Sequence, residues 1–151
     1  MKKLAEIHKR QIKFEEFNTS KNWIAEFPTE NWCLIIIAEE ENRNYFDEII
    51  RKAIDRNVGY IFSVGKQHHL IHDMADDELL IRDIENLQLP NHIVMTAGEE
   101  DFENGIWCGI NITYQDETEM NQVIILDVTK KAFEKTAKLV RDFELGYVPE
   151  D

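Results

Sequence analysis

The feature of the sequence that most constrains the fold is an unbroken apolar run from Trp32 to Ala38. Three consecutive isoleucines lie in its middle, and β-branched side chains favour an extended backbone. A strand with one solvent-exposed face alternates apolar and polar residues, whereas a strand covered on both faces is apolar throughout. The run therefore predicts a central strand of a sheet that is buried on both sides. It is far too short to cross a membrane, for which about 20 residues are needed.

Helical and extended patterns alternate along the chain after this run. Such alternation argues for one α/β domain with three layers, in which helices cover both faces of a mostly parallel sheet. We expect about four to five strands in a Rossmann-like or flavodoxin-like arrangement. The expected elements are a helix over 44–56 capped by Asn44, a strand over 60–64, a helix over 74–87, a strand over 92–95, a helix begun by the capping box Thr96-Ala97-Gly98-Glu99, a strand over 122–128, and a last helix that buries Phe133, Ala137, Val140 and Phe143.

Helical spacing also assigns two less regular segments. The helix over 74–87 is indicated by a rough apolar stripe. The first thirty residues suggest an opening amphipathic helix, followed by 23–27 as an edge strand or an ordered loop. The two stripes are Met74, Leu80, Ile81, Ile84 and Leu87, and Leu4, Ile7, Ile12, Phe14 and Phe17. We thus expect a single domain over 1–151, with the N-terminal helix and edge segment in 1–30 and the core in 31–145.

The charge of the chain restricts its partners. Thirty Asp and Glu against seventeen Lys and Arg give a formal net charge of −13, which repels phosphate backbones and anionic membranes. We expect no membrane partner and no nucleic-acid partner, so that binding to duplex DNA is negligible at physiological salt. The same charge would speed encounter with a basic protein. The chain is expected to act in the cytoplasm, because its start lacks the apolar stretch of a signal peptide. We expect it to be a monomer or a homodimer.

Cysteines and cofactor motifs exclude several kinds of chemistry. Cys33 and Cys108 lie far apart in apolar segments, which indicates reduced core thiols rather than a disulfide or a zinc-ligand pair. The sequence has no P-loop, no GxGxxG after a strand and no GxSxG. We therefore expect no cofactor and no serine-hydrolase chemistry.

Three separated segments form a recognisable pattern. The first is the strand and turn ending at Gly65, with His72-Asp73 and Asp76 after it. The second is Val94-Met95-Thr96 with Glu99-Glu100 and Ile106-Trp107, and the third is the strand 123–128. Over about residues 32 to 128, this pattern resembles an uncharacterised family of bacterial cytosolic proteins, a domain of unknown function. The resemblance implies the α/β fold and a bacterial cytosolic setting, and it implies no activity.

Polar and ionisable side chains follow three of the expected strands. In an open parallel sheet, ligands bind in the crevice beyond the carboxyl ends of the strands, where the loops diverge. We expect this crevice to be the functional edge of the molecule. Its candidate residues are Glu39, Glu40, Gly65, Lys66, His68, His69, His72, Asp73, Thr96, Glu99 and Glu100.

The richest of these loops could also hold a metal ion. Imidazole nitrogens and carboxylate oxygens suit zinc, and His68 and His72 would share a face in a helix, with Asp73 nearby. The HExxH arrangement is missing, so the spacing is permissive rather than diagnostic. The competing interpretation is a solvated loop that ends in a helix capped by Asp73.

Two classes of function follow from these observations. The first is a small acidic binding protein that recognises another protein, as immunity proteins or regulatory subunits of conflict and defence systems do. The alternative is an enzyme or small-molecule sensor that uses the strand-end crevice, with a metal-dependent hydrolase as its sharpest form. The lack of a complete catalytic motif favours the first. Convergence of His68, His69, His72, Asp73 and Glu99 would favour the second.

Overall fold

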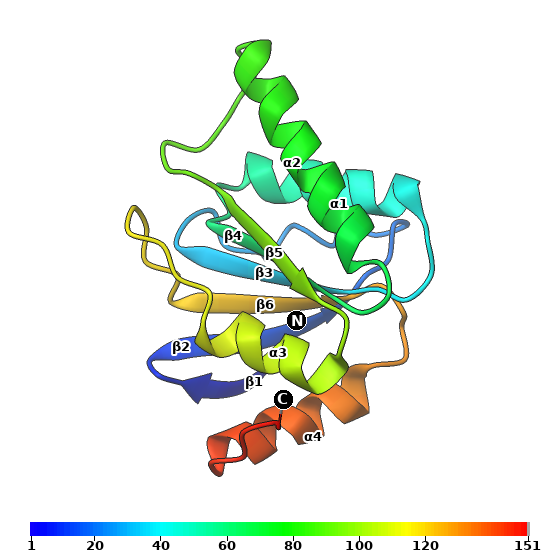
Figure 1. The fold of residues 1–151 in the computed structure, drawn as a ribbon, viewed down its shortest axis with the longest axis vertical. Helices are drawn as coiled ribbons and strands as arrows, with labels where there is room; N and C mark the ends of the chain where they lie inside the picture. The colour runs from blue at the N-terminus through cyan, green and yellow to red at the C-terminus, as the bar shows by residue number, and fades with distance from the viewer. Residues whose placement is uncertain (151) are drawn as a thin grey trace.

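Strands and helices alternate around one sheet in residues 1–150, the part of the chain that the computed structural model describes (Figure 1). In chain order the elements are β1 (Lys2–Ile7), β2 (Arg10–Glu16), β3 (Trp32–Ile37), α1 (Arg43–Asp55), β4 (Tyr60–Val64), α2 (His68–Ile84), β5 (Met95–Glu99), α3 (Phe102–Asn111), β6 (Gln122–Asp127) and α4 (Phe133–Glu144).

The sheet has six strands in the order β1-β2-β6-β3-β4-β5. Every neighbouring pair is parallel except β1 with β2. Strand β3 lies in the interior of the sheet, paired with β6 on one side and β4 on the other, and all six of its residues are buried. The prediction of a mostly parallel sheet around this strand is confirmed.

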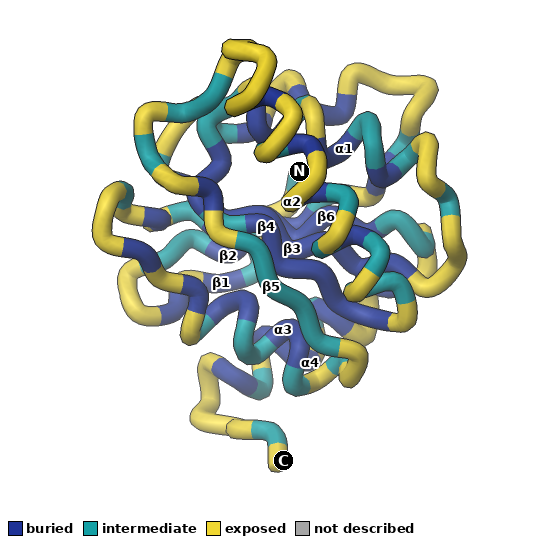
Figure 2. Tube along the Cα trace, turned by 45° about the horizontal axis from the view of Figure 1, so that its top comes forward, coloured by how far each residue is buried: buried dark blue, intermediate teal, exposed yellow. Residues whose placement is uncertain are grey.

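Helices cover both faces of the sheet. Leu34 and Ile36 of β3 enter one hydrophobic core, beneath α1 and α2, whereas Ile35 and Ile37 enter a second core, beneath α3 and α4. Figure 2 shows the buried strands between these two groups of helices. Successive side chains of a strand point to opposite faces, so an isoleucine run supplies both cores at once.

The predicted N-terminal helix is wrong, because this segment is the hairpin β1–β2. Ile12 and Phe14 alternate with half-exposed polar residues, which is the period of a strand. The turn between the strands places His8 and Lys9 at φ 50° and 65°, as tight hairpin turns require. Strand β2 then pairs with β6, more than a hundred residues away, so the sheet has six strands rather than four to five.

Residues 23–27 form an ordered loop, one of the two predicted alternatives. Trp23 packs edge-on against Phe17 and Phe27, with ring centroids 5.4 and 5.3 Å apart. Phe27 in turn meets Trp32 of the central strand at 5.7 Å. This aromatic row covers the sheet where a helix would otherwise be needed.

Several predicted boundaries are also wrong. Helix α1 is capped by Asn42, whose side chain accepts from the Tyr45 N–H, and not by Asn44. The predicted strand over 92–95 lies further along, at Met95–Glu99, so the expected capping box is part of β5. The true cap of α3 is Asp101, which accepts from the N–H of Asn104 at 2.9 Å. In α4, Val140 and Phe143 are buried as predicted, while Phe133 and Ala137 are half-buried.

Candidate functional site

The three predicted strand-end loops meet at one edge of the sheet. The N–H of Gly65 donates to the carbonyl of Glu99 at 3.0 Å, which joins the ends of β4 and β5. The N–H of Lys66 donates to Oε2 of Glu39 at 3.3 Å, and the Gln67 side chain donates to the carbonyl of the same glutamate. Glu40 and Glu100 follow their strands as exposed residues. The structure therefore brings these loops together.

Gly65 is the residue that lets the loops approach so closely. Its φ is +112°, and a Cβ there would lie 2.4 Å from the carbonyl oxygen of Ala38. Neither the backbone conformation nor the neighbouring carbonyl can accommodate a side chain without a shift.

Gly65→Ala is expected to lower the free energy of unfolding by about 2–4 kcal/mol, the sum of a left-handed backbone and a steric overlap. Urea denaturation followed by circular dichroism measures this loss. Gly146→Ala is the matched control, because Gly146 has φ +100° but a Cβ there would meet no atom of residues 1–150 within 4 Å. Equal losses in the two variants would contradict the steric argument.

The histidine-rich segment is the first half of α2 and not a loop. Helix α2 begins at His68, so Asp73 lies inside it and is no cap. The His68 and His69 rings lie 4.0 Å apart between centroids. Nε2 of His72 faces Oδ2 of Asp76 at 3.2 Å.

The arrangement of these residues does not form a metal centre. In residues 1–150 there is no group of three or more His, Cys, Asp or Glu side chains placed to hold a metal ion. His72 pairs with Asp76, whose other oxygen accepts from the Thr96 hydroxyl at 2.6 Å. Asp73 is exposed. The candidates His68, His72 and Asp73 are therefore not a zinc site in this structure.

A pocket lies between the ends of β3 and β6, at the strand-end edge; the sequence predicted Glu39 and Glu40 of its lining but not the residues after β6. In chain order, β4 and β5 are added to the sheet on one side of β3, and β6 is then added on the other side of β3. The direction in which successive strands are added therefore reverses between β3 and β6. Loops diverge at such a switch point and leave a crevice. This switch-point pocket has a volume of about 450 Å³ and is lined by Glu39, Glu40, Asn42, Tyr45, Val128, Thr129, Lys131 and Lys135.

A buried carboxylate shapes one wall of the switch-point pocket. Oδ1 of Asp127 accepts from the N–H and the hydroxyl of Thr129, at 2.9 and 2.6 Å. Oδ2 accepts from the N–H of Ala132 at 2.8 Å, so this side chain ties the β6–α4 loop to the start of α4. Aspartate at the end of an apolar strand, with threonine two residues later, is the sequence signal that could have pointed to this loop.

A second unpredicted feature is the inverted polarity of the second half of α2. Its buried side carries the charged residues Glu78 and Arg82, which are 9% and 7% exposed. Its solvent side carries the apolar residues of the predicted stripe that follow Met74, which are 47–71% exposed, whereas Met74 itself is half-buried against the core. We call this surface the outer face of α2; it consists of Leu80, Ile81 and Ile84, with Leu87 just beyond the helix.

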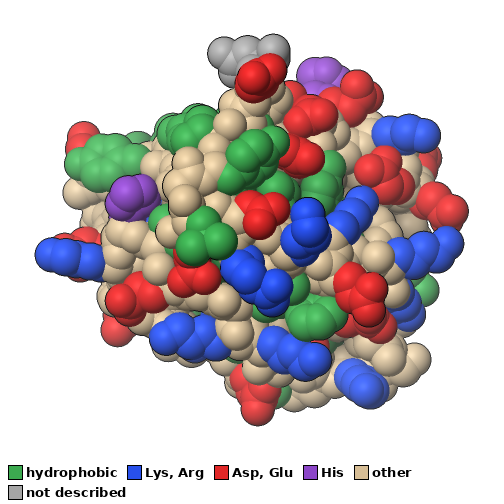
Figure 3. All heavy atoms as spheres, turned by 90° about the horizontal axis from the view of Figure 1, so that it is seen from below, with side chains coloured by type: hydrophobic (Ala, Val, Ile, Leu, Met, Phe, Trp, Pro, Cys, Tyr) green, Lys and Arg blue, Asp and Glu red, His purple; other side chains and the backbone are tan. Residues whose placement is uncertain are grey.

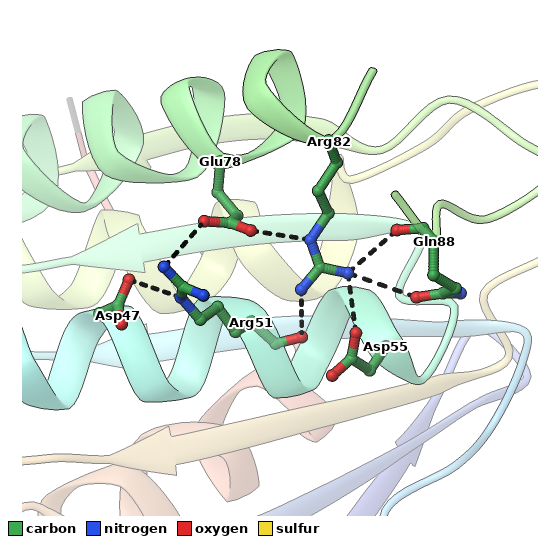
Figure 4. Close-up of polar contacts among 6 residues, drawn as sticks. All are labelled: Asp47, Arg51, Asp55, Glu78, Arg82 and Gln88. Atoms are coloured by element: carbon green, nitrogen blue, oxygen red, sulfur yellow. Dashed lines mark hydrogen bonds and ion pairs between the residues drawn. The ribbon is translucent and has the colours of Figure 1, made fainter. Parts of the chain in front are cut away.

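A polar network fixes the inverted helix on α1 (Figure 4). Nε of Arg82 donates to Oε2 of Glu78 at 2.8 Å, and its Nη1 donates to Asp55 of α1 at 2.7 Å. The same Nη1 donates to the carbonyl of Gln88 at 3.0 Å. Arg51 of α1 reaches the other oxygen of Glu78 at 3.7 Å. Because these contacts hold the charged side inward, the apolar side has to face solvent.

The charges are divided unevenly over the molecule. Residues 128–144 carry five Lys or Arg and three Asp or Glu, in a chain whose net charge is −13. Figure 3 views the molecule from below, where α4 lies in Figure 1, and shows Lys and Arg interspersed with Asp and Glu on that face. The excess of acidic residues therefore falls on the rest of the chain.

These features define an α/β protein built on a mostly parallel six-stranded sheet. In residues 1–150 no helix is both long and apolar enough to cross a bilayer. A family model described as Domain of unknown function (DUF7684) matches residues 11–142, and the chain belongs to that family. The predicted membership of an uncharacterised domain family is thereby confirmed. No curated protein and no solved structure matches the chain.

Proposed function

We propose that this protein recognises another protein, and that the outer face of α2 is its recognition surface. The inverted helix supports this proposal most directly. Monomeric proteins rarely leave several large apolar side chains side by side in water, and such patches usually contact a partner. Ile84 shares one helical stripe with Leu80 and Ile81, which precede it in α2 by four and three residues, spacings that place side chains on one face.

The partner that fits this surface has an apolar centre and a basic rim. Exposed acidic residues flank the apolar stripe along α2, namely Asp76, Asp77, Asp83 and Glu85. Interfaces pair opposite charges at their rims, which speeds association and excludes wrong partners. A second copy would bring the same acids against one another, so we expect the purified protein to be a monomer.

The unprotected edge strand β5, which lies beside α2, is a second reason to expect a partner at the outer face of α2. Strand β5 packs beneath α2 and ends the sheet, and Met95 at its start is 39% exposed. Since the N–H of Met95 and the carbonyl of Glu99 bond toward β4, the alternate residues Thr96 and Gly98 turn their backbone groups outward. This strand has no lysine and no proline, residues that commonly protect an edge from pairing.

The other edge of the sheet is protected in contrast. Strand β1 carries Lys2 and Lys3, and its register shifts between Lys3 and Ala5. Charges and bulges of this kind discourage a further strand. A partner is therefore expected at the β5 edge, beside α2.

Photo-crosslinking followed by reconstitution tests the proposal. p-Benzoylphenylalanine in place of Ile84 should crosslink one defined basic protein in cells, whereas the same probe in place of Ile112 should not. Ile112 is the matched control, because it is 57% exposed but follows α3. With that partner purified, Ile84→Asp should weaken binding at least about tenfold, which corresponds to about 1.4 kcal/mol.

Two results would contradict the proposal. One is an Ile84→Asp variant that binds the purified partner as tightly as the original chain. The other is a dimer in sedimentation experiments that Ile84→Asp dissociates, because the occupant of the surface would then be a second copy of this chain.

We also propose the kind of binding protein, its cellular compartment and the arrangement of its strands. Small acidic chains that act by binding include immunity proteins and regulatory subunits of conflict and defence systems, and we place this protein with them in a cytoplasmic setting. We further propose a Rossmann-like arrangement, which is supported by the strand order β5-β4-β3-β6, because it runs third, second, first, fourth. The alternative function, a sensor or enzyme at the carboxyl edge of the sheet, has one supporting observation, the switch-point pocket.

A further inference from the structure

The geometry of the switch-point pocket points to a second site, one that binds a small molecule carrying both a phosphate group and hydroxyl groups. Sugar phosphates and nucleoside monophosphates share this chemistry. The site is independent of the outer face of α2, which lies on another element. It therefore adds a ligand to the proposed protein-binding function and does not depend on it.

The position and size of the pocket suit such a ligand. It lies where the strand order reverses, the place at which open α/β sheets bind their ligands. Its volume of about 450 Å³ falls within the range of roughly 300–1,000 Å³ of small-molecule sites. Helices α1 and α4 both begin beside it, since Asn42 caps the first and Thr129 precedes the second.

One wall of the pocket offers hydrogen-bond donors and positive charge. Lys131 lines it, and within residues 1–150 its ammonium takes part in no ion pair of 4.0 Å or less. Lys135 also lines the pocket. Thr129 orders the loop rather than donating to a ligand, because its N–H and its hydroxyl both donate to Asp127. Asn42 belongs to the β3–α1 side of the pocket; its Oδ1 accepts from the Tyr45 N–H, which leaves its amide nitrogen as a donor there. A phosphate oxygen accepts from the ammonium of Lys131 and from an amide N–H such as that of Asn42.

The other wall offers acceptors. Glu39 and Glu40 line it, and the Glu39 carboxylate already accepts from the Lys66 N–H. Glu40 is exposed and within residues 1–150 has no ion pair. A carboxylate accepts hydrogen bonds from hydroxyl groups but repels phosphate.

The two walls together select the ligand class. A ligand with only anionic groups would be repelled by Glu40, and a cation would be repelled by Lys131. A phosphorylated polyol satisfies both walls when its phosphate lies toward α4 and its hydroxyls lie toward the β3–α1 loop. The pocket residues that carry this argument are Asn42, Lys131 and Glu40.

Titration of the full chain with three probes tests the inference: AMP, glucose 6-phosphate and inorganic phosphate. Backbone amide shifts in ¹⁵N–¹H NMR spectra report where each probe binds. We expect AMP or glucose 6-phosphate to shift the amides of Asn42, Thr129 and Lys131, and to bind more tightly than inorganic phosphate. Lys131→Gln should weaken that binding about tenfold, the effect of losing one charged hydrogen bond.

Two control variants separate the two walls. Lys138→Gln removes an exposed lysine of α4 that does not line the pocket, and should leave every affinity unchanged. Glu40→Gln should weaken the hydroxyl-bearing probes relative to inorganic phosphate. The two organic probes then tell nucleotide from sugar as the source of the chemistry.

Three outcomes would overturn the inference. They are an absence of shifts in this pocket with all three probes up to about 10 mM, well above the dissociation constants of specific small-molecule sites; equal affinities in the original chain and Lys131→Gln; and binding of inorganic phosphate as tight as that of both organic probes, which would indicate a general anion site without hydroxyl recognition.

Discussion

Ile36→Asp is expected to abolish the folded state. Ile36 is fully buried in the interior strand β3, aligned with Ser63 of β4 on one side and Leu126 of β6 on the other. The core that surrounds it in residues 1–150 is apolar, so a carboxylate there would find no cation to pair with. An unpaired buried charge costs several kcal/mol, which is comparable with a total stability of about 5–15 kcal/mol. Circular dichroism should show no cooperative transition in urea.

The matched control for this prediction is the same substitution at an exposed isoleucine. Ile84 is 71% exposed on the outer face of α2, so Ile84→Asp should change the free energy of unfolding by no more than about 0.5 kcal/mol. Ile36→Val, which removes one methylene from the core, should cost about 0.5–1.5 kcal/mol. A cooperative transition of Ile36→Asp near that of the original chain would mean that β3 is not the centre of the core.

The parts of the fold that could be predicted are those whose burial is evident from the pattern of their own residues. Strand β3 is apolar at every position, and burial on both faces is the physical reason. The hairpin β1–β2 could not be assigned in this way, because Ile7, Ile12 and Phe14 fit helical spacing and strand alternation about equally well. Pairing of β2 with β6 makes this segment a strand rather than a helix. The first twenty residues contain no pattern that indicates this distant pairing.

The candidate site, like the fold, could be predicted from the sequence only in part. The loops after β3, β4 and β5 could be brought together from the sequence, because the carboxyl ends of parallel strands share an edge. Thr129 and Lys131 were missed, since the sequence does not indicate on which side of β3 the last strand adds. The outer face of α2 was missed for a different reason. An apolar stripe at helical spacing is normally a buried face, and here Glu78 and Arg82 occupy that face instead.

Arg82→Ala is expected to lower the free energy of unfolding by about 3–5 kcal/mol, the cost of breaking a buried ion pair from one side. The substitution leaves the Glu78 carboxylate, 9% exposed, without its contact to Nε of Arg82. It also removes the bonds to Asp55 and to the carbonyl of Gln88, which tie α2 to α1 and to the following loop. The midpoint of urea denaturation measures the loss.

A double variant distinguishes loss of packing from loss of charge compensation. Replacement of both partners, as Glu78→Leu with Arg82→Met, removes the two buried charges together and keeps most of the side-chain volume. Exchanging a buried ion pair for apolar residues is often neutral or stabilising, so the double variant should be more stable than Arg82→Ala. The opposite order would mean that the hydrogen bonds of Arg82 to Asp55 and Gln88 outweigh the buried pair. In that case the inverted polarity of α2 would be set by its contacts with α1 and the following loop rather than by Glu78.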